Sequence, residues 1–298
     1  MTTSIITSLY NSKVETLDVI DKLFFPSLLN NKGADKELII IDDGSPLKKE
    51  TTYLVEKYLQ DLRRSFVDVK FIRNETNLGF SKSFNKGIFM ASGEKLLVTN
   101  DDTYFPFCSI EKLVSTLSEK PGYGLVGPIT NAQTAWSPQY CKQAPLIKSY
   151  SYTELERLEL FSKWLAEHMK DRRMITDNLC GFCFAADAYF LKNIGGFNEK
   201  YKFGYYEDTD LASRVAREYG KEKLVINMEV FVGHGGIKGT SGSFLQHPVK
   251  MIYYLLVNGI KYANDWGYGK LLKRITYGIL SQRGKGTISE LLPDKIKF

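Results

Sequence analysis

Cysteine is scarce in this sequence. Only four occur in 298 residues, at Cys108, Cys141, Cys180 and Cys183. The last two have CxxC spacing, but no second close pair completes a zinc site. Both lie in an apolar stretch where cysteine packs well as a small core residue. The pattern therefore argues against a disulfide framework or a metal or redox centre, and it fits a reducing cytoplasm.

Long apolar runs are also missing. The longest candidate, 251–257, is far shorter than the roughly 18 residues that a membrane-spanning helix needs. The chain begins Met-Thr-Thr-Ser and passes directly into a strand-like run, without the basic and apolar regions of a signal peptide. We therefore expect no transmembrane helix, no export by a signal peptide and a cytoplasmic location.

No glycine-rich loop follows the first strand-like run, where residues 9–12 read Leu-Tyr-Asn-Ser. A dinucleotide-dependent oxidoreductase would carry G-x-G-x-x-G at this point, which argues against that class. A sugar nucleotidyltransferase would also use a glycine-rich phosphate loop here, so this class is disfavoured.

Positive charge is concentrated at one end of the chain. The net charge is +6, and residues 246–298 contain nine Lys and Arg against three acids, so the first 245 residues balance to zero. This balance argues against nucleic-acid binding. The basic tail either approaches an anionic membrane surface or forms a solvated helical face that packs on the domain or on a partner subunit.

Strand and helix patterns alternate along the first hundred residues, and 43% of the chain is apolar, enough for one or two domains. The predicted strands are 3–9, 37–41, 67–72 and 95–99. The predicted helices between them are 13–29, interrupted near Pro26, then 47–64 and 80–90. This alternation predicts an α/β fold with a doubly wound parallel sheet.

The second half is less regular. We predict helices at 107–118, 153–170 and 207–219, a helical tail from 247, and short strands at 123–126, 224–227 and 230–232. Residues 130–150 have a loop pattern. The helix at 153–170 either shapes a binding pocket or covers the sheet.

Polar clusters follow three of the predicted strands. Asp42 and Asp43 end the second strand, Asn77 and Gly79 follow the third, and Asp101 and Asp102 follow the fourth. Right-handed crossovers bring the carboxyl ends of parallel strands to one edge, where ligands of open sheets bind. Because two acids at a strand end are costly to bury unpaired, we predict a site for a positively charged group at this edge.

A resemblance to a known family rests on seven pieces in order. They are Ile5-Ile6 leading to Tyr10-Asn11, Ile41-Asp-Asp-Gly-Ser45, Asn77-Leu-Gly-Phe-Ser-Lys-Ser-Phe-Asn-Lys-Gly87, Asn100-Asp-Asp102, Gly195-Gly-Phe-Asn-Glu199, Tyr206-Glu-Asp-Thr-Asp210 and His234-Gly-Gly236. Together they resemble the family-2 glycosyltransferases. Because an Asn opens the acidic triplet, the sequence is most similar to the rhamnosyltransferase-type branch.

The resemblance implies a GT-A fold, in which a Rossmann-like, mostly parallel central sheet is flanked by helices. Residues 1–245 would form the nucleotide-sugar transferase domain, with 1–128 as its nucleotide-binding half and 129–245 as its acceptor-binding half. Residues 246–298 would be a basic helical C-terminal extension. The sequence leaves the oligomeric state open.

The resemblance also implies a reaction. A UDP- or dTDP-linked sugar would be transferred, with inversion, to a hydroxyl of a saccharide, polysaccharide or lipid-linked acceptor in polysaccharide or cell-envelope biosynthesis. Mn²⁺ or Mg²⁺ would neutralise the departing diphosphate, held by Asp102 and His234. A sugar nucleotidyltransferase or a catalytically inactive nucleotide-sugar-binding protein is the alternative.

Individual roles follow from the same resemblance. Asp208 would be the general base, although it could instead only cap the following helix, and Glu207 competes for the role. Lys82 contacts donor phosphate or is a solvated helix lysine, and Asp42 and Asp43 contact the donor or form a turn with Gly44. The predicted donor-binding residues are Tyr10, Asn11, Asp42, Asp43, Asn77, Gly79, Lys82, Asn100 and Asp101.

Three further residues are assigned less specifically. Glu207, Trp136 and Lys238 are candidates for acceptor contacts or for a lid. Residues 234–243, which begin with His234, are predicted to be flexible and polar, and the glycine-containing loop 235–243 within them is either that lid or an uninvolved linker.

Overall fold

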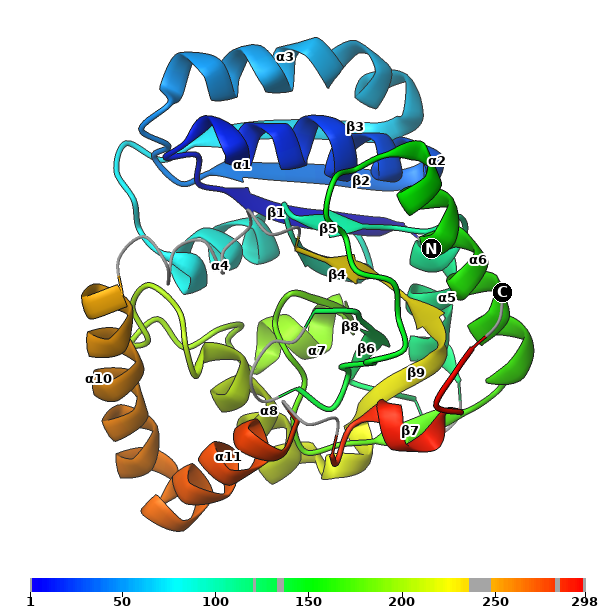
Figure 1. Cartoon of the computed structure of the whole chain (residues 1–298). Helices are drawn as coiled ribbons and strands as arrows, with labels where there is room; N and C mark the ends of the chain where they lie inside the picture. The colour runs from blue at the N-terminus through cyan, green and yellow to red at the C-terminus, as the bar shows by residue number, and fades with distance from the viewer. Residues whose placement is uncertain (1, 120–121, 133–136, 236–247, 282–284, 297–298) are drawn as a thin grey trace.

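An eight-stranded sheet lies at the centre of the molecule, between layers of helices (Figure 1). The computed structural model describes residues 2–119, 122–132, 137–235, 248–281 and 285–296. The strand order is β3-β2-β1-β4-β8-β6-β9-β7, and β10 and β5 form a separate two-stranded ribbon. The strands are β1 Thr3–Leu9, β2 Gly33–Asp42, β3 Phe66–Arg73, β4 Lys95–Asn100, β5 Thr103–Tyr104, β6 Leu125–Ile129, β7 Arg173–Ile175, β8 Cys183–Asp187, β9 Leu224–Phe231 and β10 Gly233–His234.

The first four strands are parallel and in register at their carboxyl ends. Leu9 of β1 pairs with Asp42 of β2, and Asp42 pairs with Arg73 of β3. On the other side of β1, Ser8 pairs with Asn100 of β4. The predicted polar clusters therefore follow neighbouring strands at one edge of the sheet, and the chain order reverses direction between β1 and β4, where such folds bind ligands. Two strands break the parallel pattern, because β8 runs antiparallel to β4 and β6, and β7 runs antiparallel to β9.

Helices cover both faces of the sheet because alternate strand residues point to opposite sides. Ile6 and Val98 pack in one apolar cluster with residues of α4, α7 and α8, whereas Ile5 and Leu97 pack in the other with residues of α2, α3 and α5. The helices are α1 Val14–Val19, α2 Phe25–Asn30, α3 Lys48–Ser65, α4 Phe80–Met90, α5 Ser109–Ser115, α6 Tyr152–His168, α7 Ala188–Asn193, α8 Glu207–Tyr219, α10 Pro248–Trp266 and α11 Tyr268–Ser281.

The helix predicted at 13–29 is interrupted, as expected from Pro26. Between α1 and α2 the chain forms a π-helical turn, η1, at Ile20–Phe24. Pro26 lies in the first turn of α2, where its missing N–H cannot continue the hydrogen-bond ladder of the preceding helix. The interruption therefore precedes the proline by a turn.

Two predictions for the second half need correction. The strands expected at 224–227 and 230–232 are one continuous strand, β9, and His234 lies in the short strand β10 instead of in a flexible loop. The helix expected at 153–170 is α6, which buries Leu158, Phe161 and Leu165 and packs Phe161 edge-on against Phe231 of β9. This packing fits the alternative in which the helix covers the sheet.

The predicted helical tail is confirmed. Helices α10 and α11 meet at Gly267, whose φ of 89° belongs to the left-handed region that glycine adopts without strain. They lie along one side of the molecule, at the lower left of Figure 1, next to α8. Among the described residues, the helices are all too short or too polar to cross a bilayer.

Candidate active site

A short ribbon brings Asp102 and His234 together. In this ribbon β5 and β10 are antiparallel, so that His234 pairs with Thr103, and the N–H of Gly235 donates to the backbone carbonyl of Asp102 at 2.8 Å. As a result His234 Nε2 lies 3.3 Å from Asp102 Oδ1, with both side chains buried. The two residues predicted to bind a metal ion are therefore neighbours.

The imidazole of His234 is held from several sides. Its ring stacks on Phe182 with centroids 4.5 Å apart, and its backbone N–H donates to Asn131 Oδ1 at 2.9 Å. The amide nitrogen of Asn100, the first residue of the predicted triplet, lies 3.4 Å from Nε2. The other ring nitrogen, Nδ1, is buried without a hydrogen-bond partner among the described residues.

These groups fit a divalent cation. A carboxylate oxygen and an imidazole nitrogen side by side suit Mn²⁺, which accepts both ligand types. Within the described ranges, no cluster of three or more His, Cys, Asp and Glu residues could hold a metal ion. Protein ligands this few are typical of Mg²⁺ or Mn²⁺ sites in which substrate phosphate and water supply the remaining oxygens.

Asp101 adds a second carboxyl beside the pair. Loss of hydration and then the negative charge of Asp102 raise its pKa to about 8. Its proton therefore compensates for a concentration of negative charge that a bound cation would also neutralise.

The predicted base, Asp208, lies in the first turn of α8. Its Oδ2 accepts from the N–H of Gly181 at 3.0 Å, and its Oδ1 accepts from the N–H of Thr209 at 2.6 Å. The residue that caps the helix is Tyr206, so the alternative in which Asp208 is only the cap is wrong. The side chain remains half-buried, at the amino-terminal end of α8.

The neighbouring Glu207 differs from Asp208. It is buried, and desolvation followed by the charge of Asp208 raises its pKa to about 8. One of its oxygens, Oε2, has no hydrogen-bond partner among the described residues. Glu207 therefore holds its proton at neutral pH, which is the wrong state for a base.

Two consecutive residues join the metal pair to the base. Gly181 donates its N–H to Asp208, and the ring of Phe182 stacks on His234. The backbone carbonyl of Phe182 also accepts from the N–H of Asn100 at 2.8 Å. A Cβ added to Gly181 would lie 3.2 Å from the Cβ of Asp208, so a larger residue here would require one of the two positions to shift by a few tenths of an ångström.

The acids after β2 have a different environment. Asp42 is fully buried, forms an ion pair with Arg73 at 2.6 Å and accepts from the N–H of Ser45 at 2.9 Å. The Asp42–Ser45 bond is the kind of turn that the sequence left open as the structural alternative. Asp42 lies two strands from Asn100, about 10 Å away by strand spacing, so it is on the same edge but not in the metal pair.

Asp43 is committed to the loop that follows β3. Its two oxygens accept from the N–H of Leu78 at 2.8 Å, the N–H of Gly79 at 2.9 Å and the side-chain amide of Asn74 at 3.0 Å. Asn77 Oδ1 also accepts from the N–H of Gly79 at 2.9 Å. Asp43 thus shapes the loop at the rim of the sheet.

The other predicted donor residues separate into two groups. Tyr10 and Lys82 are exposed. Asn11 is fully buried, where its side chain donates to Thr51 and its N–H to Ser45, so it supports the rim from inside. Trp136, Lys238 and residues 236–243 of the predicted lid loop lie outside the described residues.

The residues that sequence reasoning missed are mostly partners of those it found. They include Arg73, Asn131, Gly181 and Phe182. Tyr150 belongs here too, because burial and then the charge of Asp102 raise its pKa to about 12. None of these residues carries a local signal, except that Gly181 lies in a stretch of small residues.

A backbone feature precedes the base directly. Phe203, Gly204, Tyr205 and Tyr206 all have positive φ, at 61°, 105°, 72° and 73°. For each non-glycine residue this conformation costs about 1 kcal/mol or more, so surrounding contacts must enforce it.

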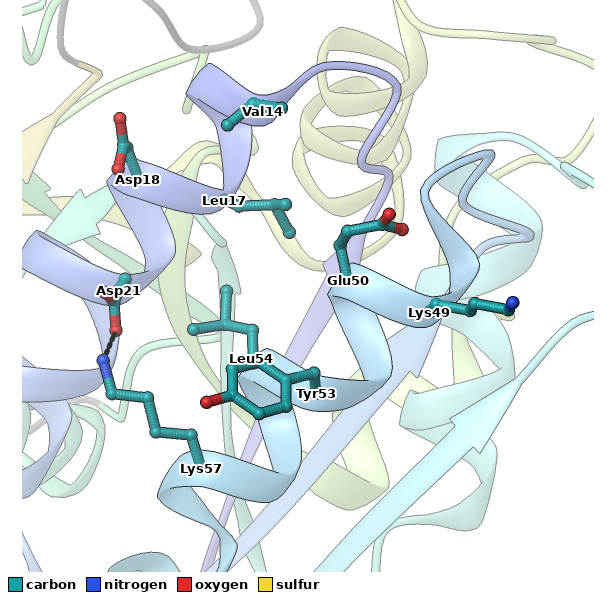
Figure 2. Close-up of a pocket in the computed structure, with 9 residues that line it drawn as sticks. All are labelled: Val14, Leu17, Asp18, Asp21, Lys49, Glu50, Tyr53, Leu54 and Lys57. Carbon is teal, nitrogen blue, oxygen red and sulfur yellow. Dashed lines mark hydrogen bonds and ion pairs between the residues drawn. The ribbon is translucent and has the colours of Figure 1, made fainter.

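One groove lies away from the predicted site residues. A groove of about 380 Å³ between α1 and α3 is lined by apolar side chains such as Leu17 and Leu54, with charged groups around them (Figure 2). Asp21 and Lys57 pair across it at 2.6 Å. None of its lining residues is a predicted site residue.

Several known proteins resemble this chain. An uncharacterized glycosyltransferase of Haemophilus influenzae is 32% identical over 123 residues, which cover 41% of this chain and 37% of that protein. The match thus spans little more than a third of the relative's length.

Solved structures share the fold at low identity. GalNAc-T7, solved with UDP, GalNAc and Mn²⁺, has a TM-score of 0.53 at 18% identity over 78% of this chain and 43% of its own. TarS of S. aureus, solved with UDP-GlcNAc, has a TM-score of 0.53 at 18% identity over 79% and 58%. The mannosyltransferase PcManGT of Pyrobaculum calidifontis, solved with GDP-Man and Mn²⁺, has a TM-score of 0.51 at 16% identity over 96% and 76%. The chain therefore has the GT-A fold.

The family model for glycosyl transferase family 2 matches residues 4–190, well over half of the chain. That range includes Asp42 and Asn100 at the ends of β2 and β4, and Asp102 in the turn after β4, and it ends before Asp208. The chain belongs to glycosyl transferase family 2.

Proposed function

We propose that this protein is a metal-dependent, inverting glycosyltransferase that moves a sugar from a UDP- or dTDP-linked donor to a hydroxyl of a saccharide, polysaccharide or lipid-linked acceptor. The observation that carries the proposal is the arrangement around Gly181 and Phe182, which contact Asp208 and His234, with Asp102 3.3 Å from His234. The proposal extends to polysaccharide or cell-envelope biosynthesis and to a rhamnosyltransferase-type donor.

The residues would act in one displacement. Asp208 accepts the proton of the acceptor hydroxyl while that oxygen forms a bond to the anomeric carbon and the bond from that carbon to the diphosphate oxygen breaks. Attack opposite the leaving group inverts the anomeric carbon. When bound by Asp102 and His234, Mn²⁺ or Mg²⁺ supplies positive charge to the departing diphosphate.

The proposed division of labour follows the chain. Residues 1–128 bind the nucleotide, 129–245 bind the acceptor, and 246–298 form the C-terminal extension. Tyr10 and Lys82 are accessible for donor contacts, whereas Asn11, Asp42 and Asp43 act by shaping the rim.

A donor screen tests the proposed reaction. Purified protein with Mn²⁺ is incubated with UDP-, dTDP- and GDP-sugars, and nucleotide release is measured with and without EDTA. We expect slow, EDTA-sensitive hydrolysis of one donor. Pyrophosphate release from a nucleoside triphosphate and a sugar phosphate would favour a nucleotidyltransferase, and UDP binding without any turnover would favour an inactive binding protein.

The proposal includes peripheral contact with an anionic membrane. Exposed apolar residues recur every three or four positions along one face of each C-terminal helix: Val249, Tyr253, Leu256 and Ile260 on α10, and Tyr268, Leu272, Ile275 and Ile279 on α11. An exposed apolar face with basic residues beside it is typical of helices that lie in a membrane interface.

Charge favours lipid over a second copy of the chain as the occupant of this face. Helix α11 contains Lys270, Lys273 and Arg274 but no acid, and the single carboxylate of Asp177 pairs with both Lys273 and Arg274, so an excess of positive charge remains. A two-fold contact would place this excess positive charge opposite the same charge on the second copy, whereas anionic headgroups would neutralise it.

Vesicle flotation tests this surface. The double variant Leu256→Glu and Leu272→Glu should lose binding to phosphatidylserine vesicles at low salt, whereas Asn264→Glu, an exposed change on the same helix, should lose less. Absence of binding by the unchanged protein would overturn the proposal. A dimer that the double variant dissociates would assign the face to a second copy.

A further inference from the structure

The strained segment 203–206 is held by one face of α10. Four side chains spaced four residues apart along this helix, Tyr254, Asn258, Tyr262 and Trp266, point to the segment and to the helix that follows it. They contact the chain at positions between Lys202 and Ser213. Because residues four apart lie on the same face of a helix, one face of α10 packs against the residues around the base.

Asn258 makes the most specific of these contacts. Its side-chain amide donates to the backbone carbonyls of Lys202 at 3.1 Å and Gly204 at 2.8 Å. The side chain is fully buried, and its own oxygen accepts from Lys261, which also donates to the carbonyl of Lys200 at 2.8 Å. Asn258 therefore fixes the carbonyls on both sides of Phe203, the first residue with a positive φ.

Aromatic contacts hold the rest of the segment. The ring of Tyr254 packs on Phe203 with centroids 5.0 Å apart, and the buried ring of Tyr262 stacks on Tyr206 at 5.4 Å. The hydroxyl of Tyr262 also lies 2.9 Å from that of Ser213 on α8. Because Tyr206 is the cap of α8, its position determines where the helix begins and where Asp208 lies.

The last residue of this face and helix α11 complete the support. Trp266 donates through its indole N–H to Asp210 Oδ1 at 3.0 Å. On α11 the buried Arg274 donates to the carboxylate of Asp177 at 3.2 Å, and Lys273 donates to it at 2.9 Å. Asp177 lies four residues before Gly181, whose N–H donates to the carboxylate of Asp208. The helices α10 and α11 therefore support two chain segments that meet at Asp208: residues 177–181 and residues 203–208.

We propose that the C-terminal helices position Asp208 for transfer, with Asn258 as the principal positioning residue. They do so by enforcing the left-handed conformation of residues 203–206 and anchoring Asp177. This inference rests on the proposed role of Asp208 as base. It assigns a function in the reaction to a part of the chain that begins well after the family match at residues 4–190 ends.

The test compares Asn258→Ala with Asn264→Ala, a matched change at an exposed position of the same helix. We expect Asn258→Ala to lower kcat by about 10- to 100-fold, since a displacement of roughly 1 Å is enough for such a loss, while KM for the donor stays within about twofold. Hydrogen exchange of backbone amides in 200–208 should become faster. Binding of UDP with Mn²⁺ should be unchanged, because the Asp102–His234 pair lies at the β5–β10 ribbon and not in the segment that Asn258 contacts.

Tyr262→Phe keeps the protein testable if Asn258→Ala fails to fold. It retains the ring on Tyr206 and removes only the hydroxyl contact with Ser213, so a several-fold loss of kcat at unchanged donor KM is expected. The positioning role is overturned if both Asn258→Ala and Tyr262→Phe have the kcat and the exchange rates of Asn264→Ala. Asp208→Asn separates this outcome from failure of the proposed reaction, since full turnover in that variant removes the base whatever the α10 variants do.

Discussion

The acids at the end of β2 and the acids beside Asp102 and Asp208 differ in how far their negative charge is compensated. Asp42 and Asp43 are deeply buried, yet an arginine or backbone and amide N–H groups contact all their oxygens. Asp101 and Glu207 have pKa values raised to about 8, and Glu207 Oε2 is buried without a hydrogen-bond partner among the described residues. The first pair stabilises the fold, whereas the second is under-compensated.

Burying an acid without enough compensating charge or hydrogen bonds lowers the stability of the fold, so such acids indicate a functional site. A cation near Asp102 and an acceptor hydroxyl near Asp208 would supply the missing positive charge and hydrogen bonds. Replacing acids by amides in both regions therefore sharpens the comparison, because the same chemical change should have opposite effects on stability.

The largest effect is expected for Asp208→Asn. An amide cannot take a proton, so turnover should fall by about 10²- to 10⁴-fold. The amide oxygen can still accept from Gly181, and UDP binding with Mn²⁺ should therefore stay close to that of the unchanged protein. Steady-state kinetics and calorimetric titration measure both quantities, and turnover equal to that of the unchanged protein would exclude Asp208 as base.

Arg73→Ala should give the largest loss of stability. It leaves the fully buried carboxylate of Asp42 without its cation, which costs about 3–5 kcal/mol in the free energy of unfolding. Urea denaturation measures the loss. Arg64→Ala is the control, because Arg64 is exposed and lies 3.9 Å from an equally exposed Asp61, so a change below about 1 kcal/mol is expected. Equal losses in the two variants would show that the Asp42 ion pair contributes nothing special.

Asp43→Asn should destabilise by about 2 kcal/mol. The carboxylate accepts from three N–H donors, and an amide would turn its own NH₂ group toward one of them. The same denaturation assay applies, with the exposed Asp61→Asn as control. A variant as stable as the control would mean that the loop after β3 does not depend on this acid.

Glu207→Gln is expected to have the opposite and smallest effect. The folded-state pKa of about 8 lies above the ordinary value of 4.5, so the folded protein holds this proton more tightly than the unfolded chain. Stability therefore falls as pH rises from 4.5 to 8, and the penalty is fully present above pH 8. Glutamine does not titrate, so the Glu207→Gln variant lacks this dependence of stability on pH.

Thermal unfolding at pH 5 and pH 9 without added metal measures the difference. At pH 9 the Tm of Glu207→Gln should exceed that of the unchanged protein by about 2–4 °C, or roughly 1 kcal/mol in a chain of this size. At pH 5 the difference in Tm between the variant and the unchanged protein should be smaller. A gap that is equal at both pH values would contradict the raised pKa. Asp101 is present in both proteins, so its own titration cancels.

Much of the fold could be predicted because its signals are local. The strand predicted at 3–9 is β1, the helix predicted at 80–90 is α4, and Gly220 ends α8 with a φ of 91° as expected of a glycine at a helix end. The apolar run at 96–98 followed by acids marked the end of the strand that precedes Asp102. Each signal depends on a few neighbouring residues.

The site was harder to predict because its chemistry depends on distant partners. Asp42 looked available for a donor, but Arg73 from the next strand occupies it. Glu207 and Asp208 are adjacent in sequence, yet burial protonates one, while the other is held by Gly181. His234 was expected in a flexible loop and is instead part of a ribbon with β5.

The sequence by itself determined the alternation of strands and helices, the edge where the polar clusters lie, and the family, because apolar periodicity, turn residues and ordered motifs are carried by short segments. Only the tertiary structure decided which acids are neutralised, that Asp102 lies beside His234, and that α10 contacts the left-handed segment before Asp208. Burial and hydrogen-bond partners set the state of each group, and both arise only when distant segments pack together.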